Sequence, residues 1–350
     1  MISSKGCYRL LTVMMMVSLL LVSCAPRIIR VPITTDADGE YDAQFPVGDA
    51  SRELQEISLS TRQIHSISYY KSYVFPPESK ITASDIRNIP LKQTDTRIDY
   101  FNNSVYGTAT IIYHRGDHIA LLTCAHIVVS PDTLLSYLSA GGQEYLESIS
   151  VKIDESHSVI DLPESGNPEL EILGMDLSSD IAVLTAKLPR IPEAPIPVFS
   201  YPIGKSGELK WGTFVYLIGY PMGFKMITRG VTSLPDSKKT GSFLMDVPFN
   251  EGMSGGIVLA LRDGVPNFEL VGMAKSVSAN FTRVLSPEEE KKGHINPRIP
   301  YTGHTFVRQL SHINYGVTFT TSSEEILKFF RKHQKAFLKE GFDFSRLIEP

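Results

Sequence analysis

The feature that most constrains the fold of this chain is a long series of short, strand-like segments. From residue 57 onward, runs rich in β-branched and aromatic residues recur, and clusters of Gly, Pro, Asn or Asp separate most of them. Many short strands with such breakers are typical of barrels and sandwiches. The predicted strands are IHSISYYKSYVF (64–75), VYGTATIIY (105–113), HIALLTCAHIVV (118–129), SISVKI (148–153), LEILGM (170–175), DIAVLTA (180–186), TFVYLIGY (213–220), SFLMDVPF (242–249), GIVLAL (257–262) and FELVGMAKSV (268–277).

Helical signals are few by comparison. One short segment, PDTLLSYLS, lies near 131–139, and a longer one, SSEEILKFFRKHQKAFLKE, covers 322–340. The longer segment has a serine at its cap position, acidic residues in its first turn and regularly spaced apolar residues, as helices require. The sequence therefore predicts an all-β protein with a C-terminal helix.

The overall balance of residues excludes several classes of protein. Hydrophobic residues make up 42% of the chain and charged residues 21%, which argues against a disordered chain or a membrane protein with several spans. The formal net charge is −4, so the sequence gives no electrostatic reason to expect a nucleic-acid partner.

Residues 1–23 have the features of a targeting segment. Lys5 and Arg9 precede a mostly apolar run of 13 residues, 10–22, which is too short to span a bilayer permanently. The run ends in LVSC, which resembles a bacterial lipoprotein signal and implies cleavage before Cys24 and lipid attachment to it. Ala25 follows, which by the same resemblance implies the outer membrane, facing the periplasm. An ordinary cleaved signal, or an uncleaved anchor, is the alternative.

The cysteines agree with export. Cys7 would leave with the signal and Cys24 would carry lipid, so Cys124 remains alone and no intrachain disulfide is expected. Because apolar residues flank Cys124, we expect an inert core thiol. Residues 25 to about 55 are mixed and polar, which is typical of a tether between a lipid anchor and a folded domain.

Three short segments carry the residue types needed for nucleophilic catalysis. They are TCAHIV around His126, SDIAVL around Asp180 and NEGMSGG around Ser254. A serine hydroxyl needs an imidazole to take its proton, and the imidazole needs a carboxylate to fix its tautomer. Backbone N–H groups must also face the developing oxyanion, and glycines beside the serine permit that turn. Each motif alone is weak, but the three occur in one of the known triad orders.

These segments resemble the trypsin-like serine proteases, and among them the bacterial HtrA/Deg type. That family has T-x-A-H-x-V around its base, S-D-I-A-L-L around its acid and G-N-S-G-G around its nucleophile. The flanking stretches VYLIGYPMGF and ITRGVTS are also similar, and the resemblance covers roughly residues 100–335. It implies two six-stranded β-barrels with the site at their junction. The expected organisation is a signal peptide (1–23), a tether and N-terminal extension (24–97), a protease domain (98–340) and a C-terminal tail (341–350).

The resemblance also implies roles for individual residues. His126 would be the general base, Asp180 would orient it and Ser254 would attack the scissile carbonyl of a protein or peptide substrate. The N–H groups of Gly252 and Ser254 would form the oxyanion hole. Met253 stands where the family usually has Asn or Asp, so one polar contact in the loop is replaced. The chain ends at Pro350, and we expect no PDZ domain after the protease.

The resemblance places the substrate pocket less fully. Its base would fall at Pro248, and Lys275 lies on the strand expected to line the cleft. Because no acid occupies position 248, we expect apolar or small side chains to be preferred over Arg or Lys. No cofactor and no metal are expected; His114 and His118 flank a turn and do not share a helical face.

Several alternatives remain at this stage. Asp154, Asp161 and Asp176 compete with Asp180, which only its position at the start of an apolar strand favours. GMSGG also fits G-x-S-x-G, the nucleophile elbow of α/β-hydrolase esterases, but that fold needs a helix after the serine and its histidine downstream. Finally, Met253 leaves room for a lipid-anchored protein that binds peptides without cleaving them.

Overall fold

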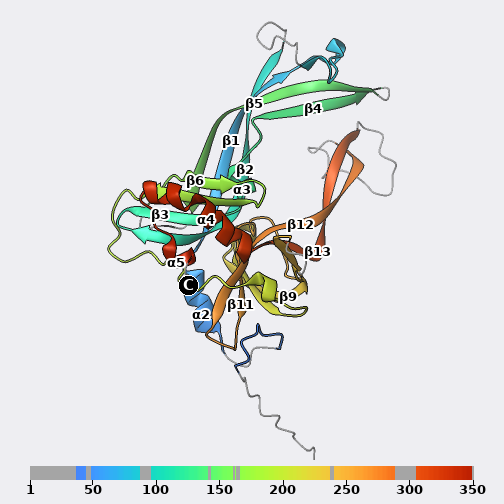
Figure 1. Cartoon of the computed structure of the whole chain (residues 1–350). Coiled ribbons are helices and arrows are strands. Elements are labelled where there is room, and N and C mark those ends of the chain that lie inside the picture. Colours follow the sequence, from blue (N-terminus) through green and yellow to red (C-terminus); the bar gives the residue numbers. More distant parts are fainter. Residues whose placement is uncertain are drawn as a thin grey trace, which may run out of the picture. The chain divides into compact units, whose positions relative to one another are not determined.

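Two antiparallel sheets make up most of the protein, as the computed structural model in Figure 1 shows. The structure describes residues 37–44, 49–86, 96–140, 143–160, 162, 166–236, 240–287 and 305–348. The expected signal peptide, Cys24 and the lipid on it lie outside these residues. No helix in the described ranges is long and apolar enough to cross a membrane.

The first sheet, called here the N-terminal sheet, has seven strands in the order β4-β5-β1-β2-β3-β7-β6. The strands are β1 (Thr61–Val74), β2 (Arg97–Arg115), β3 (His118–Thr123), β4 (Thr133–Ala140), β5 (Gln143–Ile160), β6 (Glu171–Asp176) and β7 (Ile181–Lys187). Burial along β1 alternates with a period of two, because successive side chains point to opposite faces of a strand. One face of the sheet can therefore build a core.

The second sheet closes into a six-stranded barrel, called here the C-terminal barrel, in the order β10-β13-β12-β11-β8-β9. Its strands are β8 (Phe214–Gly219), β9 (Met226–Leu234), β10 (Ser242–Met245), β11 (Ile257–Leu261), β12 (Phe268–Pro287) and β13 (Thr305–Ser322). All five residues of β11 are buried, as expected for a strand whose two faces both meet apolar neighbours. The expected all-β, double-barrel class is confirmed, with seven strands rather than six in the first sheet.

In the described ranges, helices are short except for one. They are α2 (Ser51–Ser58), α3 (Ala125–Val128), α4 (Ser323–Lys339) and α5 (Ser345–Ile348), with single 3₁₀ turns η1 (Pro77–Ser79), η4 (Ser206–Glu208) and η5 (Pro221–Gly223). Helix α4 is the predicted C-terminal helix. The Ser322 hydroxyl caps it by accepting a hydrogen bond from the Glu325 N–H at 3.3 Å. Its buried residues pack into the core of the N-terminal sheet, although α4 follows the last strand of the C-terminal barrel; they include Ile326, Phe329, Phe330 and Phe337.

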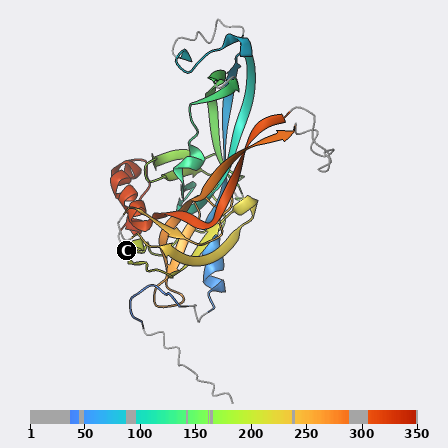
Figure 2. The same ribbon diagram turned by 90° about the vertical axis from the view of Figure 1, so that its right-hand side faces the viewer.

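Part of the N-terminal sheet extends past its neighbours. Strands β1 and β2 pair along residues 61–74 and 97–110, but β3 pairs with β2 only from Thr110 onward. We call the extended part the arm, defined as residues 66–74, 97–105, 133–140 and 143–157. Figures 1 and 2 both show the arm leading away from the C-terminal barrel.

The structure corrects one sequence prediction and adds to others. The segment near 131–139 is not a helix but strand β4, because it pairs with β5 over eight residues. Tertiary pairing has overridden a weak local preference. Strand β13 was not predicted, and β1 lies in the same sheet as strands beyond residue 98.

Candidate active site

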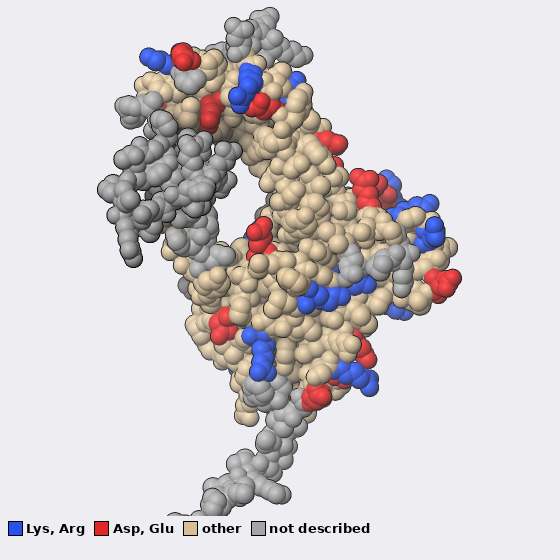
Figure 3. Space-filling view, turned by 180° about the vertical axis from the view of Figure 1, so that it is seen from behind, with Lys and Arg blue, Asp and Glu red and all other residues tan. Residues whose placement is uncertain are grey.

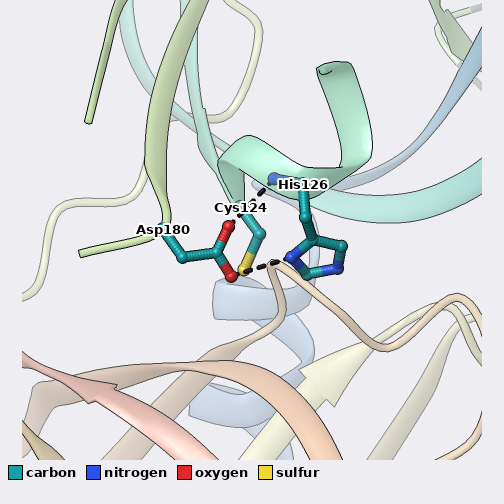
Figure 4. A group of neighbouring side chains, drawn as sticks. All are labelled: Cys124, His126 and Asp180. Carbon is teal, nitrogen blue, oxygen red and sulfur yellow. Dashed lines mark hydrogen bonds and ion pairs between the residues drawn. The ribbon is translucent and has the colours of Figure 1, made fainter. Parts of the chain in front are cut away.

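His126 and Asp180 meet at one end of the N-terminal sheet. His126 lies on α3, directly after β3, and Asp180 ends the turn before β7 (Figure 4). The Asp180 Oδ2 atom is 2.8 Å from His126 Nδ1, and Oδ1 accepts the backbone N–H of His126 at 2.9 Å. Asp180 has a left-handed backbone, with φ of 58°, and is 5% exposed. One buried carboxylate thus fixes both the ring and the main chain of an exposed histidine.

Ser254 lies on the loop between β10 and β11, and backbone hydrogen bonds hold that loop in place. The Gly255 N–H donates to Ala274 at 2.8 Å, the Gly256 N–H to Met253 at 2.9 Å, and the Ser254 carbonyl accepts from Thr108 at 2.8 Å. Gly255 is required here, because a methyl group on its α-carbon would lie 2.0 Å from the Thr108 carbonyl oxygen.

The N–H groups of Gly252 and Ser254, expected to form the oxyanion hole, differ from the amide between them. Gly252 has φ of 95°, and among the described residues neither amide donates a hydrogen bond to a protein acceptor. The intervening Met253 N–H instead donates to Asn250 at 3.1 Å. Met253, the departure from the family pattern, is 2% exposed and packs in the core of the barrel. Apolar burial of Met253 therefore anchors the loop in place of the polar contact whose replacement the sequence predicts.

The Ser254 hydroxyl does not contact the imidazole in this structure. It donates to the backbone carbonyl of Lys275 at 3.1 Å, and the serine is half-buried. The structure therefore joins His126 to Asp180 and places the Ser254 hydroxyl against Lys275, which lies on the strand expected to line the cleft. It also shows that the segment after Ser254 is strand β11 and not a helix, so the α/β-hydrolase elbow is not formed.

Cys124 completes the group drawn in Figure 4. Ligand atoms of Cys124, His126 and Asp180 lie within 4.8 Å of one another, so these three could in principle hold a metal ion. Burial, and then the charge of Asp180, raise the pKa of the Cys124 thiol well above its ordinary value. A thiol ligates zinc as the thiolate, and this one donates to the Ala274 carbonyl at 3.4 Å. The set therefore fits an inert thiol beside a His–Asp pair better than a metal site.

The competing aspartates lie in other environments. Asp176 accepts hydrogen bonds from Ser178 and forms an ion pair with Lys332 at 3.1 Å, which together lower its pKa. Asp154 lies on the arm, in β5. Asp161 is outside the described residues. Among described acids, Asp180 is the one hydrogen-bonded to His126.

The predicted pocket residues differ in exposure. Pro248 is exposed and Lys275 half-buried. Lys275 lines a small polar hollow of about 260 Å³ that also includes Ser179. A second hollow of about 450 Å³ adjoins Gly252 on another side and shares no residue with the first; it is lined by Gln63, Tyr106, Met222, Gly223, Glu251 and Gly252.

Sequence reasoning missed the contribution of Thr108. Its buried hydroxyl donates to the Gly252 carbonyl at 2.7 Å and accepts the N–H of Tyr220 at 2.9 Å. Together with its N–H on Ser254, Thr108 links the N-terminal sheet to the Ser254 loop. The GTAT stretch was noticed as a strand, but a threonine inside a strand gives no sign of such a partner 144 residues away.

Comparisons with known proteins give partial matches to this chain. Residues 107–273 match the family model "Trypsin-like peptidase domain". A protein from Ectopseudomonas mendocina (strain ymp), "Probable periplasmic serine endoprotease DegP-like", is 31% identical over 152 residues, covering 42% of this chain and 29% of that protein. A protein of the same description from Hahella chejuensis (strain KCTC 2396) is 36% identical over 101 residues, covering 27% of this chain and 20% of its own length.

The chain thus spans less than a third of the length of these curated relatives. Among solved structures, the crystal structure of the serine endoprotease from Yersinia pestis is similar, with a TM-score of 0.39 and 15% identity over 83% of this chain and 67% of that chain.

Proposed function

We propose that this chain, whose residues 107–273 match the trypsin-like peptidase domain, is a serine endopeptidase. The observation that carries the proposal is the contact of 2.8 Å between His126 Nδ1 and the buried Asp180 carboxylate. In the neutral imidazole this contact favours the tautomer that carries its proton on Nδ1, which leaves Nε2 to accept a proton as a general base does.

The proposed reaction has two halves. His126 Nε2 takes the proton of the Ser254 hydroxyl while Oγ attacks the scissile carbonyl, and the tetrahedral intermediate collapses when the imidazolium gives that proton to the leaving amine. The acyl group then remains on Ser254. A water molecule, deprotonated by the same imidazole, attacks the ester, and the proton returns to Ser254 as the acid leaves.

The amides of Gly252 and Ser254 would bind the oxyanion in both halves. They are supported for this role by their lack of acceptors within the part of the chain that the structure describes, and by the left-handed backbone of Gly252. Such donors contribute about 3 kcal/mol each to the transition state when they are held in advance.

Reaction requires the Ser254 hydroxyl to leave the Lys275 carbonyl. A serine side chain turns about one torsion with three staggered minima, so a rotamer change would release the hydroxyl from that carbonyl. Catalytic hydrogen bonds are often loose without substrate. The same contact favours the second candidate function, a peptide-binding protein that does not cleave, because it holds the nucleophile away from its base.

Labelling with a fluorophosphonate separates the two candidates. We expect the wild-type protein to be labelled covalently at one residue, and Ser254→Ala to lose the label with its melting temperature preserved. Ser84→Ala, at an exposed serine in the connection between β1 and β2, serves as the matched control and should label normally. A folded wild-type protein that takes no label would support the non-catalytic candidate.

The proposed location is the bacterial envelope, with a lipid anchor on Cys24. Support comes from the apolar run before Cys24 and from relatives whose names describe them as periplasmic. Incorporation of a palmitate analogue into the full-length protein in cells tests it. Cys24→Ser should abolish incorporation, whereas Cys7→Ser, inside the expected signal peptide, should not. Equal incorporation by both variants would refute the anchor.

The proposed substrates are proteins or peptides with an apolar or small residue before the scissile bond. Support comes from Pro248, which supplies no charge to pair with a basic side chain. A panel of peptides that differ only at that position tests this preference. Fastest cleavage after Arg or Lys would contradict it.

A further inference from the structure

We propose that the open edge of β2 in the arm binds the part of a substrate that follows the scissile bond, as an added β-strand. The proposal rests on the proposed function, because it names the substrate class of the same site. The class is a polypeptide that is extended over about nine residues after the cleaved bond and carries apolar side chains there.

The edge of β2 between Ile98 and Tyr106 has no partner among the described strands. Strand β1 pairs with one side of β2 along its length, whereas β3 covers the other side only from Thr110. A strand edge of this kind presents a row of unpaired N–H and C=O groups, which bind an extended chain readily. Natural proteins rarely leave such an edge long and uncharged without a partner.

The register shows which residues face the open side. The Ile111 N–H donates to Ser60 at 2.8 Å, on the β1 side, while the Thr108 N–H donates to Ser254 at 2.8 Å, on the other side. Because antiparallel strands alternate between bonded and unbonded pairs, every second residue back from Thr108 also faces away from β1. These residues are Tyr106, Ser104, Asn102, Tyr100 and Ile98.

This edge is continuous with the candidate active site. Tyr106 is two residues from Thr108, and it lines the hollow of about 450 Å³ whose other wall includes Gly252. Its ring stacks on His65 with centroids 4.2 Å apart, which holds it at the mouth of the hollow. Lys275, expected to line the cleft before the scissile bond, belongs to the other hollow. A chain that passes Ser254 and Gly252 therefore reaches Tyr106 next, and then the rest of the edge.

The surface beside the edge is apolar and largely uncharged. Tyr100 is 67% exposed, Ile98 45% and Phe101 43%. Arg97 and Asp99 pair with each other at 2.6 Å, so they leave little net charge. On the face seen in Figure 3, the part of the arm nearest the rest of the protein carries few charged side chains. Nine residues of strand extend over about 30 Å, so the edge would bind only chains that have lost their fold.

Kinetics with one substrate in two lengths test the proposal. A bond that the enzyme cleaves is first mapped by mass spectrometry in digests of β-casein. Two peptides are then made, one ending two residues after that bond and one extended by eight more residues. We expect kcat/KM for the long peptide to exceed that for the short one by about tenfold, as a few added backbone hydrogen bonds would give.

A proline removes an outward-facing donor from the edge without removing a bond to β1. Ser104→Pro, or Asn102→Pro if the first does not fold, should reduce the long-to-short ratio to below about threefold. Thr133→Pro is the matched control, because Thr133 lies on the outer edge of β4 and by register its N–H also faces away from β5. The long-to-short ratio of this variant should equal that of the wild type. An unchanged ratio in a folded Ser104→Pro protein would overturn the proposal.

Two further measurements separate this inference from the proposed function. In Ser254→Ala protein, fluorescein-labelled β-casein should bind, and adding Ser104→Pro should weaken binding by about tenfold, whether or not the wild type cleaves. Absence of cleavage would refute only the proposed function. Casein binding that is unchanged by Ser104→Pro would refute the inference. A dimer in sedimentation that Ser104→Pro dissociates would also refute it, because a second copy of the chain would then occupy the edge.

Discussion

Replacing Gly252 by alanine tests the oxyanion hole directly. At φ of 95° an alanine costs about 1–2 kcal/mol of backbone strain. Its methyl group would also lie 2.3 Å from the Tyr220 carbonyl oxygen, and Cβ atoms essentially never approach closer than 3.0 Å. The backbone must therefore shift by about 0.7 Å, which moves the amide that would face the oxyanion. We expect kcat to fall by about 10²- to 10³-fold, because the donor acts mainly in the transition state.

Gly341→Ala is the matched control for this change. Gly341 has φ of 88°, and a methyl group there would meet nothing within 4 Å, so the variant has the strain without the displacement. The assay is kcat on a cleaved peptide, with thermal melts of both variants. Gly341→Ala should keep wild-type kcat and lose some stability. If Gly252→Ala keeps kcat within about threefold while melting like Gly341→Ala, the amide of Gly252 has no part in catalysis.

Three other changes are predicted. Asp180→Asn removes the acceptor of the His126 ring proton, so kcat should fall roughly 10⁴-fold with the fold intact; a loss under tenfold in peptide hydrolysis would refute the orienting role. Hydrogen bonds hold the pKa of Asp176 below its ordinary value, so its stabilisation is present at neutral pH and is lost as pH falls below about 4. Asp176→Asn should therefore lower the melting temperature more at pH 7 than at pH 2, and an equal effect at both would contradict this. The Arg262 guanidinium lies 3.0 Å from the Glu269 carboxylate, and Arg262→Ala removes this partner. The free energy of unfolding in urea should therefore fall by about 2 kcal/mol. An unchanged urea midpoint would show that the ion pair contributes nothing to stability.

The sequence predicted much of the local structure correctly, because the relevant signals are local. The hairpin around Arg115 to His118 follows from a polar turn between two apolar runs. The start of α4 follows from a serine cap and two acids, and the cap is present. The error at β4 arose where the local signal was weak and pairing with β5 decided the outcome.

The candidate site could be predicted only as a set of residue types. Three motifs in order named His126, Asp180 and Ser254, because proton transfer and nucleophilic attack need those groups. The contact between His126 and Asp180 joins residues 54 apart, and the bond from Thr108 to Gly252 joins residues 144 apart. No local pattern encodes such distances. The hydrogen bond from Ser254 to Lys275 is likewise a choice among rotamers that the surrounding backbone decides.

The amino-acid order thus determined the strands, the capped helix and the chemistry that the chain offers. The tertiary structure decided which acid meets the histidine, which amides are left without acceptors and which strand edge remains open beside them. The physical reason is that propensity, capping and alternation act over a few residues. Hydrogen-bond partners and burial depend instead on segments that come together only when both sheets have formed.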